Sequence, residues 1–128
     1  MRGTAICMLF LLYPKCALTH PPLLDPYVHC PPVNTMTKNA AFAFRHDRVR
    51  VNCIAVGWMA TPAEHEVMTK YHAKPSTWLR DADAAHPMGR ILRPRDIAKM
   101  AVHLLSDDAE MQTASVVDIH EQHMGCWD

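Results

Sequence analysis

Proline is concentrated at the start of this 128-residue chain: six of its ten prolines lie within residues 1–32. Proline lacks a backbone N–H and has a fixed φ, so residues 18–32 favour neither a regular helix nor a central strand. Only Arg2, Lys15 and Asp25 carry charge before Val33, whereas charged and apolar residues are interleaved after it. We therefore divide the chain into an apolar, Pro-rich segment, residues 1–32, and a globular portion, residues 33–128.

An apolar run, residues 4–13, opens the Pro-rich segment and allows three interpretations. A short basic start followed by about ten apolar residues is typical of a signal-peptide core, although Lys15-Cys16-Ala17 is a poor cleavage site. The chain would then be a small secreted protein. The second interpretation is a buried strand over residues 5–12, and the third is a segment outside the fold that follows. The run is too short for a membrane span, which needs about 20 apolar residues.

Charge and small-residue content exclude several classes of function. Lys plus Arg and Asp plus Glu both number 13, so neither a nucleic-acid partner, which requires a basic face, nor a membrane partner is expected. The four glycines lie far apart, and neither G-x-G-x-x-G nor G-x-x-x-x-G-K-[ST] occurs. The five cysteines contain no C-x-x-C pair and their number is odd. This argues against a zinc site or a disulfide framework and favours reduced thiols in a cytoplasmic protein.

Hydrophobic periodicity predicts alternating helices and strands after Val33. Residues 49–56 are mostly apolar and rich in β-branched side chains, which indicates a strand buried on both faces of a parallel sheet. Residues 115–119 predict a last short strand, and short helical pieces are expected over residues 63–71 and 76–84. Helix, strand, insertion, helix and strand is an α/β order.

Two longer helices carry apolar faces at helical spacing. One is expected over residues 33–45 and the other begins at Pro94, a favourable first helical position. The first face consists of Val33, Met36, Ala40, Ala41 and Phe44, and the second of Ile97, Met100, Ala101, Leu104 and Leu105. The second face is expected to bury against Val51, Cys53 or Ala55 on one strand and Val116 or Ile119 on the other. His103, between the apolar positions, is expected to be exposed.

The order and spacing of several motifs resemble the C-terminal part of the short-chain dehydrogenase/reductase family. They are residues 35–41 (TMTKNAA), 48–62 (RVRVNCIAVGWMATP), 86–91 (HPMGRI), 93–98 (RPRDIA), 107–109 (DDA) and 113–118 (TASVVD). The resemblance covers about 95 residues, with nothing before Val33. It implies a partial Rossmann-like, doubly wound parallel sheet, in which the two predicted strands are the last two of seven.

The resemblance also implies where a cofactor would bind. In the family, the loop of residues 57–61 lies against the nicotinamide half of NAD or NADP. Gly57 would let the backbone approach the cofactor, Met59 would offer backbone hydrogen bonds to the carboxamide, and Thr61 would offer its hydroxyl. Residues 62–87 would be the substrate-binding lid, in which Trp78 is a candidate pocket residue and, alternatively, a packing residue.

The family's catalytic Tyr-x-x-x-Lys has no counterpart. Counting back from Lys38 places the tyrosine at Pro26 and the lysine at Cys30, and Tyr27 is one residue off. The lysine lowers the pKa of the phenol so that it can exchange a proton with substrate, and so we assign no catalytic residue. The family also has proline where this chain has Val56.

These observations predict a truncated member of an NAD(P)-dependent oxidoreductase family that is inactive alone. Without a glycine-rich loop for the cofactor's phosphates, the chain alone is not expected to bind NAD or NADP. The family's first five strands do not fit into 32 residues, so the strand at 49–56 is expected to lack one neighbour. The alternative is a non-catalytic protein that forms a homo-oligomer or docks onto an intact relative.

No metal site is expected. His120, Glu121, His123 and Cys126 match no zinc pattern and are interpreted as a solvated tail. The histidines at 65 and 72, with Glu64 and Glu66 nearby, are interpreted as a surface helix.

Overall fold

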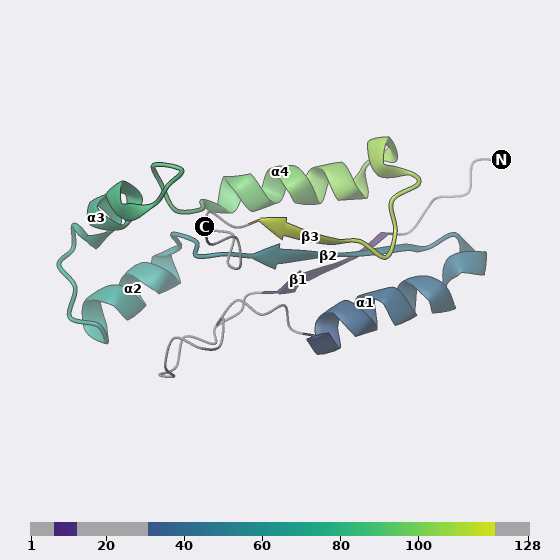
Figure 1. Ribbon diagram of the computed structural model, residues 1–128, viewed down its shortest axis with the longest axis horizontal. Coiled ribbons are helices and arrows are strands. Elements are labelled where there is room, and N and C mark those ends of the chain that lie inside the picture. Colours follow the sequence, from purple (N-terminus) through teal and green to yellow (C-terminus); the bar gives the residue numbers. More distant parts are fainter. Residues whose placement is uncertain (1–6, 13–30, 120–128) are drawn as a thin grey trace, which may run out of the picture.

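The computed structural model describes residues 7–12 and 31–119, which form a parallel sheet with a helix on each face (Figure 1). The elements in chain order are β1 (Cys7–Leu12), α1 (Pro31–Ala43), β2 (Arg50–Val56), α2 (Pro62–Lys70), α3 (Trp78–Ala85), α4 (Pro94–Leu105) and β3 (Val116–Ile119). Short 3-10 turns at Arg45–Asp47 and Asp107–Ala109 follow α1 and α4. The α/β prediction is confirmed, and element bounds differ from it by a few residues at most.

The sheet has the strand order β1-β2-β3 in the part of the chain that the structure describes. β1 pairs with β2 in parallel, with Leu9 opposite Asn52, and β2 pairs with β3 in parallel, with Cys53 opposite Val116. Of the three interpretations of the apolar run, the structure therefore shows the strand. The expectation that the strand at 49–56 lacks a neighbour on one side is wrong, because β1 lies there.

Every residue of β2 is buried, as expected for a strand covered on both faces. α4 lies over one face of the sheet and α1 over the other (Figure 1). Side chains of a strand alternate between faces, and Ile54 and Val56 pack with Ile97 and Leu104 of α4. Cys53 points the other way, since its thiol is hydrogen-bonded to Thr37 of α1.

The predicted partners of α4 were on the wrong face of β2. Sheet register explains the result: Ile54 is opposite Val117, and Val56 is opposite Ile119. Paired residues of adjacent strands share a face. The sheet face that α4 covers therefore contains these four residues. The opposite face contains Val51, Cys53, Ala55 and Val116. Ile119 was predicted correctly.

The buried side of α1 also differs from the prediction. Thr37 is fully buried and Ala41 is 4% exposed, whereas Met36 and Phe44 are 46% and 42% exposed. Thr37 can be buried because its hydroxyl donates to the carbonyl of Val33, 2.8 Å away in the same helix. On α4, Leu105 is likewise exposed, while Ile97 and Leu104 are buried and His103 is exposed as expected.

Candidate functional site

The loop of residues 57–61 leaves the carboxyl end of β2 and leads into α2. The helices α2 and α3 lie beyond the carboxyl ends of β2 and β3, and the first turn of α4 faces the same end (Figure 1). In open α/β sheets, ligands bind outside the carboxyl ends of the strands. The loop and the two lid helices, which together cover most of residues 62–87, are therefore the candidate site.

Backbone hydrogen bonds join the loop to β3 and to the segment that precedes α4. The Gly57 N–H donates to the carbonyl of Ile119 at 2.9 Å, which joins the start of the loop to β3. The Ala60 N–H donates to the Leu92 carbonyl at 2.9 Å, and the Leu92 N–H donates to the Trp58 carbonyl at 3.1 Å. These two bonds form a parallel bridge between Met59 and Leu92.

The geometry of that bridge leaves the Met59 backbone groups outside the pairing. In a parallel bridge of this form, the bonded groups belong to the residues on either side of the central one, here Trp58 and Ala60. The N–H and C=O of Met59 therefore point to the opposite side. One donor and one acceptor on a single residue are complementary to a primary carboxamide, which carries an NH₂ and a C=O.

Thr61 begins α2. Its backbone is extended, Pro62 follows at the first helical position, and its Oγ1 accepts a hydrogen bond from the Glu64 N–H at 3.1 Å. A hydroxyl carries one donor and two acceptor lone pairs. The Thr61 proton is therefore not used by this cap and remains able to donate to a cofactor group.

Trp78 is 4% exposed and belongs to the packed core of the lid. With Ala82 and Ile91 it forms a buried cluster that Trp58 covers. The two indoles are stacked, with ring centroids 5.7 Å apart and an interplanar angle of 24°. The Trp78 Nε1 donates to His65 Nδ1 at 3.0 Å. The site's first loop and its lid are thus joined through aromatic contact.

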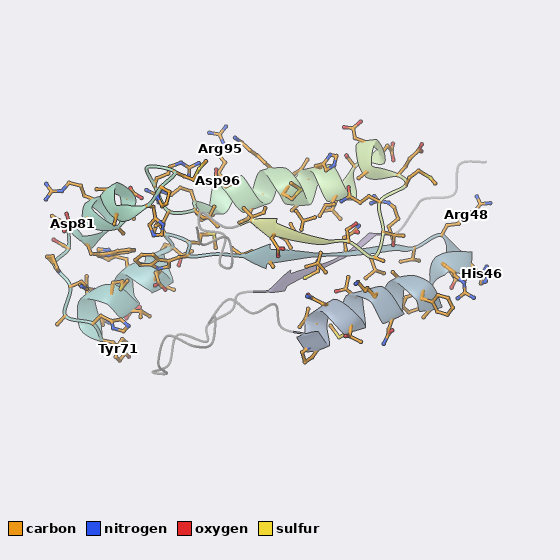
Figure 2. All side chains as sticks on the ribbon, viewed as in Figure 1. His46, Arg48, Tyr71, Asp81, Arg95 and Asp96 are labelled. Atoms are coloured by element: carbon orange, nitrogen blue, oxygen red, sulfur yellow. The ribbon has the colours of Figure 1, made fainter. Side chains whose placement is uncertain are left out.

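Two carboxylates fix the connection from α3 to α4. Asp83 accepts from the Ile91 N–H at 2.9 Å and from Arg93 at 2.6 Å. Asp96 pairs with Arg90 through two bonds of 2.6 and 3.0 Å, and it accepts from the Arg93 N–H at 2.9 Å. Figure 2 places Asp96 at the start of α4, beside this connection. Both carboxylates therefore hold the segment that presents Leu92 to the loop.

These contacts lower the pKa of both acids. The hydrogen bonds from Arg90 and from the Arg93 N–H, reinforced by the Arg90 charge, lower the pKa of Asp96 from 3.8 to about 2. Burial acts to raise the pKa of Asp83, but the bonds from Arg93 and Ile91 and the nearby arginine charges outweigh it and lower that pKa. Both groups are therefore carboxylates near neutral pH.

Several sequence-predicted positions lie elsewhere or outside the described residues. Pro26, Tyr27 and Cys30, the positions nearest the family's catalytic pair, are outside them, as is the tail from His120 to Cys126. Within residues 7–12 and 31–119, no group of three or more His, Cys, Asp or Glu could hold a metal ion. In those same ranges no helix combines the length and apolar character needed to cross a membrane.

Glu64 and Leu92 are the site residues that sequence reasoning missed. Glu64 is only 9% exposed, and its carboxylate accepts from Trp58 Nε1 at 2.8 Å. Its position three residues after Thr61 is the spacing of a capping box, a signal that was available in the sequence. No comparable signal identified Leu92, because its role depends on main-chain groups.

Comparisons with known proteins agree with this architecture. The family model described as enoyl-(acyl carrier protein) reductase matches residues 32–120. Cyclohexanol dehydrogenase from Acinetobacter sp. (strain SE19) is 33% identical over 88 residues, which are 67% of this chain and 31% of the relative. L-fucose dehydrogenase from Bos taurus is 36% identical over 75 residues, 59% of this chain and 27% of the relative. The chain thus spans about a third of the length of these curated relatives.

Solved structures show the same relationship. A short chain dehydrogenase family protein from Francisella tularensis superimposes with a TM-score of 0.71 at 22% identity, covering 91% of this chain and 50% of that one. A 4-hydroxyisoleucine dehydrogenase mutant complexed with NADH and succinate gives a TM-score of 0.66 at 20% identity, covering 95% and 48%. At these identities the likeness shows a shared Rossmann-like fold.

Proposed function

Because the chain belongs to the short-chain dehydrogenase/reductase family, we propose that it supplies the nicotinamide side and substrate lid of an NAD(P)-dependent oxidoreductase. One observation carries the proposal: the Met59 N–H and C=O are left outside the bridge to Leu92, at the carboxyl end of β2. The curated relatives include dehydrogenases named for cyclohexanol and L-fucose. The proposed substrate class is accordingly an alcohol or the corresponding carbonyl compound.

The residues have separate roles in this proposal. Gly57 brings the main chain close to the cofactor, Met59 holds the carboxamide through its backbone, and Thr61 donates its hydroxyl proton. NAD(P), when bound, supplies or accepts the hydride. Trp78 stiffens the lid from within and so shapes the substrate pocket indirectly, through Trp58.

We do not propose that these 128 residues catalyse hydride transfer alone. The sequence contains no Tyr-x-x-x-Lys and no glycine-rich phosphate loop. A substrate oxygen would therefore have no phenol to exchange a proton with, and the pyrophosphate would lack a helix N-terminus opened by glycines. We infer that hydride transfer requires both features to be supplied together with this chain.

A second candidate function is docking onto an intact relative or a second copy. Large apolar side chains are exposed on the outer sides of both covering helices, namely Met36, Phe42 and Phe44 at α1 and Val102 and Leu105 on α4. Exposed apolar side chains favour docking where they gather into one contiguous patch. Light scattering at several concentrations, alone and with a full-length family member, distinguishes a monomer from either complex.

The test of the main proposal is a titration with nicotinamide mononucleotide, which carries the carboxamide without the pyrophosphate bridge. Amide resonances of Met59 and Thr61 should shift on titration, and those of β3 should not. The matched control is nicotinic acid mononucleotide, whose carboxylate cannot donate to the Met59 C=O. Equal shifts with both ligands, or shifts confined to α1, would reject the assignment of this loop.

A further inference from the structure

We propose that Glu64 is a positioning residue: from the lid, it sets the conformation in which residues 57–61 present the Met59 backbone. Glu64 belongs to α2 and has no assigned role in cofactor contact. The claim that the loop presents its backbone to a cofactor rests on the proposed function. The claim that Glu64 holds the loop in place does not rest on it, and the two claims are tested separately.

One residue contacts both ends of the loop. In the usual capping box, the carboxylate at the third helical position returns to the N–H of the cap residue. The Glu64 N–H does bond to Thr61 Oγ1, at 3.1 Å, but its carboxylate accepts instead from the Trp58 indole, at 2.8 Å. Trp58 and Thr61 flank Met59, whose backbone groups point away from Leu92, and Ala60, whose N–H donates to the Leu92 carbonyl.

The burial of Glu64 supports a specific role. Glu64 as a residue is only 9% exposed, so its side chain loses hydration, and hydrogen bonds in a defined geometry offset that loss. Its exposed neighbour Glu66 forms an ordinary helix-surface ion pair with Lys70. The two glutamates lie two residues apart on α2, about half a helical turn, and therefore provide a matched pair for comparison.

Trp58 transmits this constraint to the main chain. Its ring is stacked on Trp78 and tilted against His86, with centroids 5.7 Å apart in both cases. Its carbonyl accepts from Leu92. Rotation of the indole would break the bond to Glu64 and both ring contacts, so the peptide that leads into Met59 has a single favoured orientation.

The experiment compares Glu64→Leu, Glu64→Gln and Glu66→Ala with the natural chain by two measurements. Hydrogen exchange reports on the Ala60 amide, which donates to Leu92, and the exciton signal in circular dichroism reports on the Trp58–Trp78 stack. Glu64→Leu should raise exchange about tenfold, the effect of losing one hydrogen bond, and weaken the exciton signal. Glu64→Gln keeps an accepting oxygen and should rescue both, and Glu66→Ala should match the natural chain.

Equal exchange in Glu64→Leu and Glu66→Ala would overturn the proposal, as would failure of Glu64→Gln to rescue. If Glu64→Leu unfolds, Trp58→Phe removes the same bond from the other side and keeps an aromatic ring. It should raise exchange at Ala60 to a similar extent, and unchanged exchange would reject the proposal. A separate titration with nicotinamide mononucleotide tests the cofactor role. Its failure in the natural chain would reject the proposed function while the exchange result still decides how the loop is held.

Discussion

The guanidinium of Arg50 lies 2.6 Å from the carbonyl oxygen of Leu104, although Arg50 begins β2 and Leu104 lies in the last turn of α4. A second bond reaches the carbonyl of Ser106 at 3.2 Å. Arg50 is 7% exposed, so its charge is placed against the negative end of the α4 dipole with little water between them. Arg50, the first residue of β2, therefore caps the C-terminus of α4, the helix that covers this face of the sheet.

Replacing Arg50 by methionine should lower the free energy of unfolding by about 2–3 kcal/mol, because the helix-end carbonyls lose a charged donor inside the protein. Arg80→Met is the matched control, since the Arg80 side chain is 81% exposed and pairs with its neighbour Asp81 at 3.5 Å. Urea denaturation measures both variants. Equal losses would show that the Arg50–Leu104 bond contributes nothing specific.

Truncating Leu104 to alanine should cost about 2–5 kcal/mol, because the side chain is fully buried in the cluster of Ile54, Val56 and Ile97. Leu104→Asp should prevent folding, since it buries an unpaired charge. His103→Lys and Leu105→Ala, one residue to either side, should both change stability by less than about 0.5 kcal/mol. Soluble yield and thermal unfolding measure the series, and a comparable loss in Leu105→Ala would contradict the orientation of α4.

Acid should destabilise the connection between α3 and α4. The pKa of Asp96 is lowered in the folded protein from 3.8 to about 2, so its contribution to stability is complete above the ordinary value. That contribution is lost as pH falls from about 4 to about 2, because the unfolded chain takes up the proton first. Asp83, whose pKa is also lowered, acts in the same direction.

The test is the urea midpoint measured across this pH range for the natural chain and Asp96→Asn. The variant should be less stable at neutral pH and should show a shallower decline with acid. Asp81→Asn is the control, because that side chain is 64% exposed on the same lid helix as Asp83. Parallel pH curves for the natural chain and Asp96→Asn would refute the assignment.

Ala114→Gly should stabilise the protein by about 0.5–1 kcal/mol, because a left-handed backbone is unfavourable for alanine and free of strain for glycine. Ala114 has a φ of 59°, and its N–H donates to the Val51 carbonyl at 2.8 Å, so this conformation is fixed. Ala98→Gly, at an exposed position inside α4, should instead destabilise by about 1 kcal/mol. A fall in melting temperature for Ala114→Gly would show that the strain is absent.

Sequence reasoning succeeded where a pattern has one structural meaning. The mostly apolar, β-branched run over residues 49–56 predicted burial on both faces, and Pro94 marked the start of α4. It failed to predict which side chains of β2 face α4 and which face α1. Alternation along a strand gives two sets of side chains, but it does not say which set faces which helix. It also failed at Thr37, whose polar side chain was buried because its hydroxyl bonds within α1.

The site was predictable only as a segment. The motif around Gly57 located the loop, whereas the spacing from Thr61 to Glu64, which is typical of a helix start, was not recognised. The partners that fix the loop are distant along the chain, because Trp78 lies within the lid and Leu92 lies beyond it. Such contacts depend on how the lid packs, which no local pattern specifies.

The parallel register that places Cys53 beside Val116 also orders the events of folding. The lid and α4 lie between Cys53 and Val116 in the sequence, so the pairing of these two residues closes a long loop. Closing that loop costs conformational entropy before the strand contacts form. The lid and α4 consist of local contacts and can form sooner. During synthesis, the backbone edge of β2 that pairs with β3 therefore stays without its hydrogen-bond partners until almost the last described residue has been made. The rate of elongation through the lid sets how long that edge is open to wrong partners.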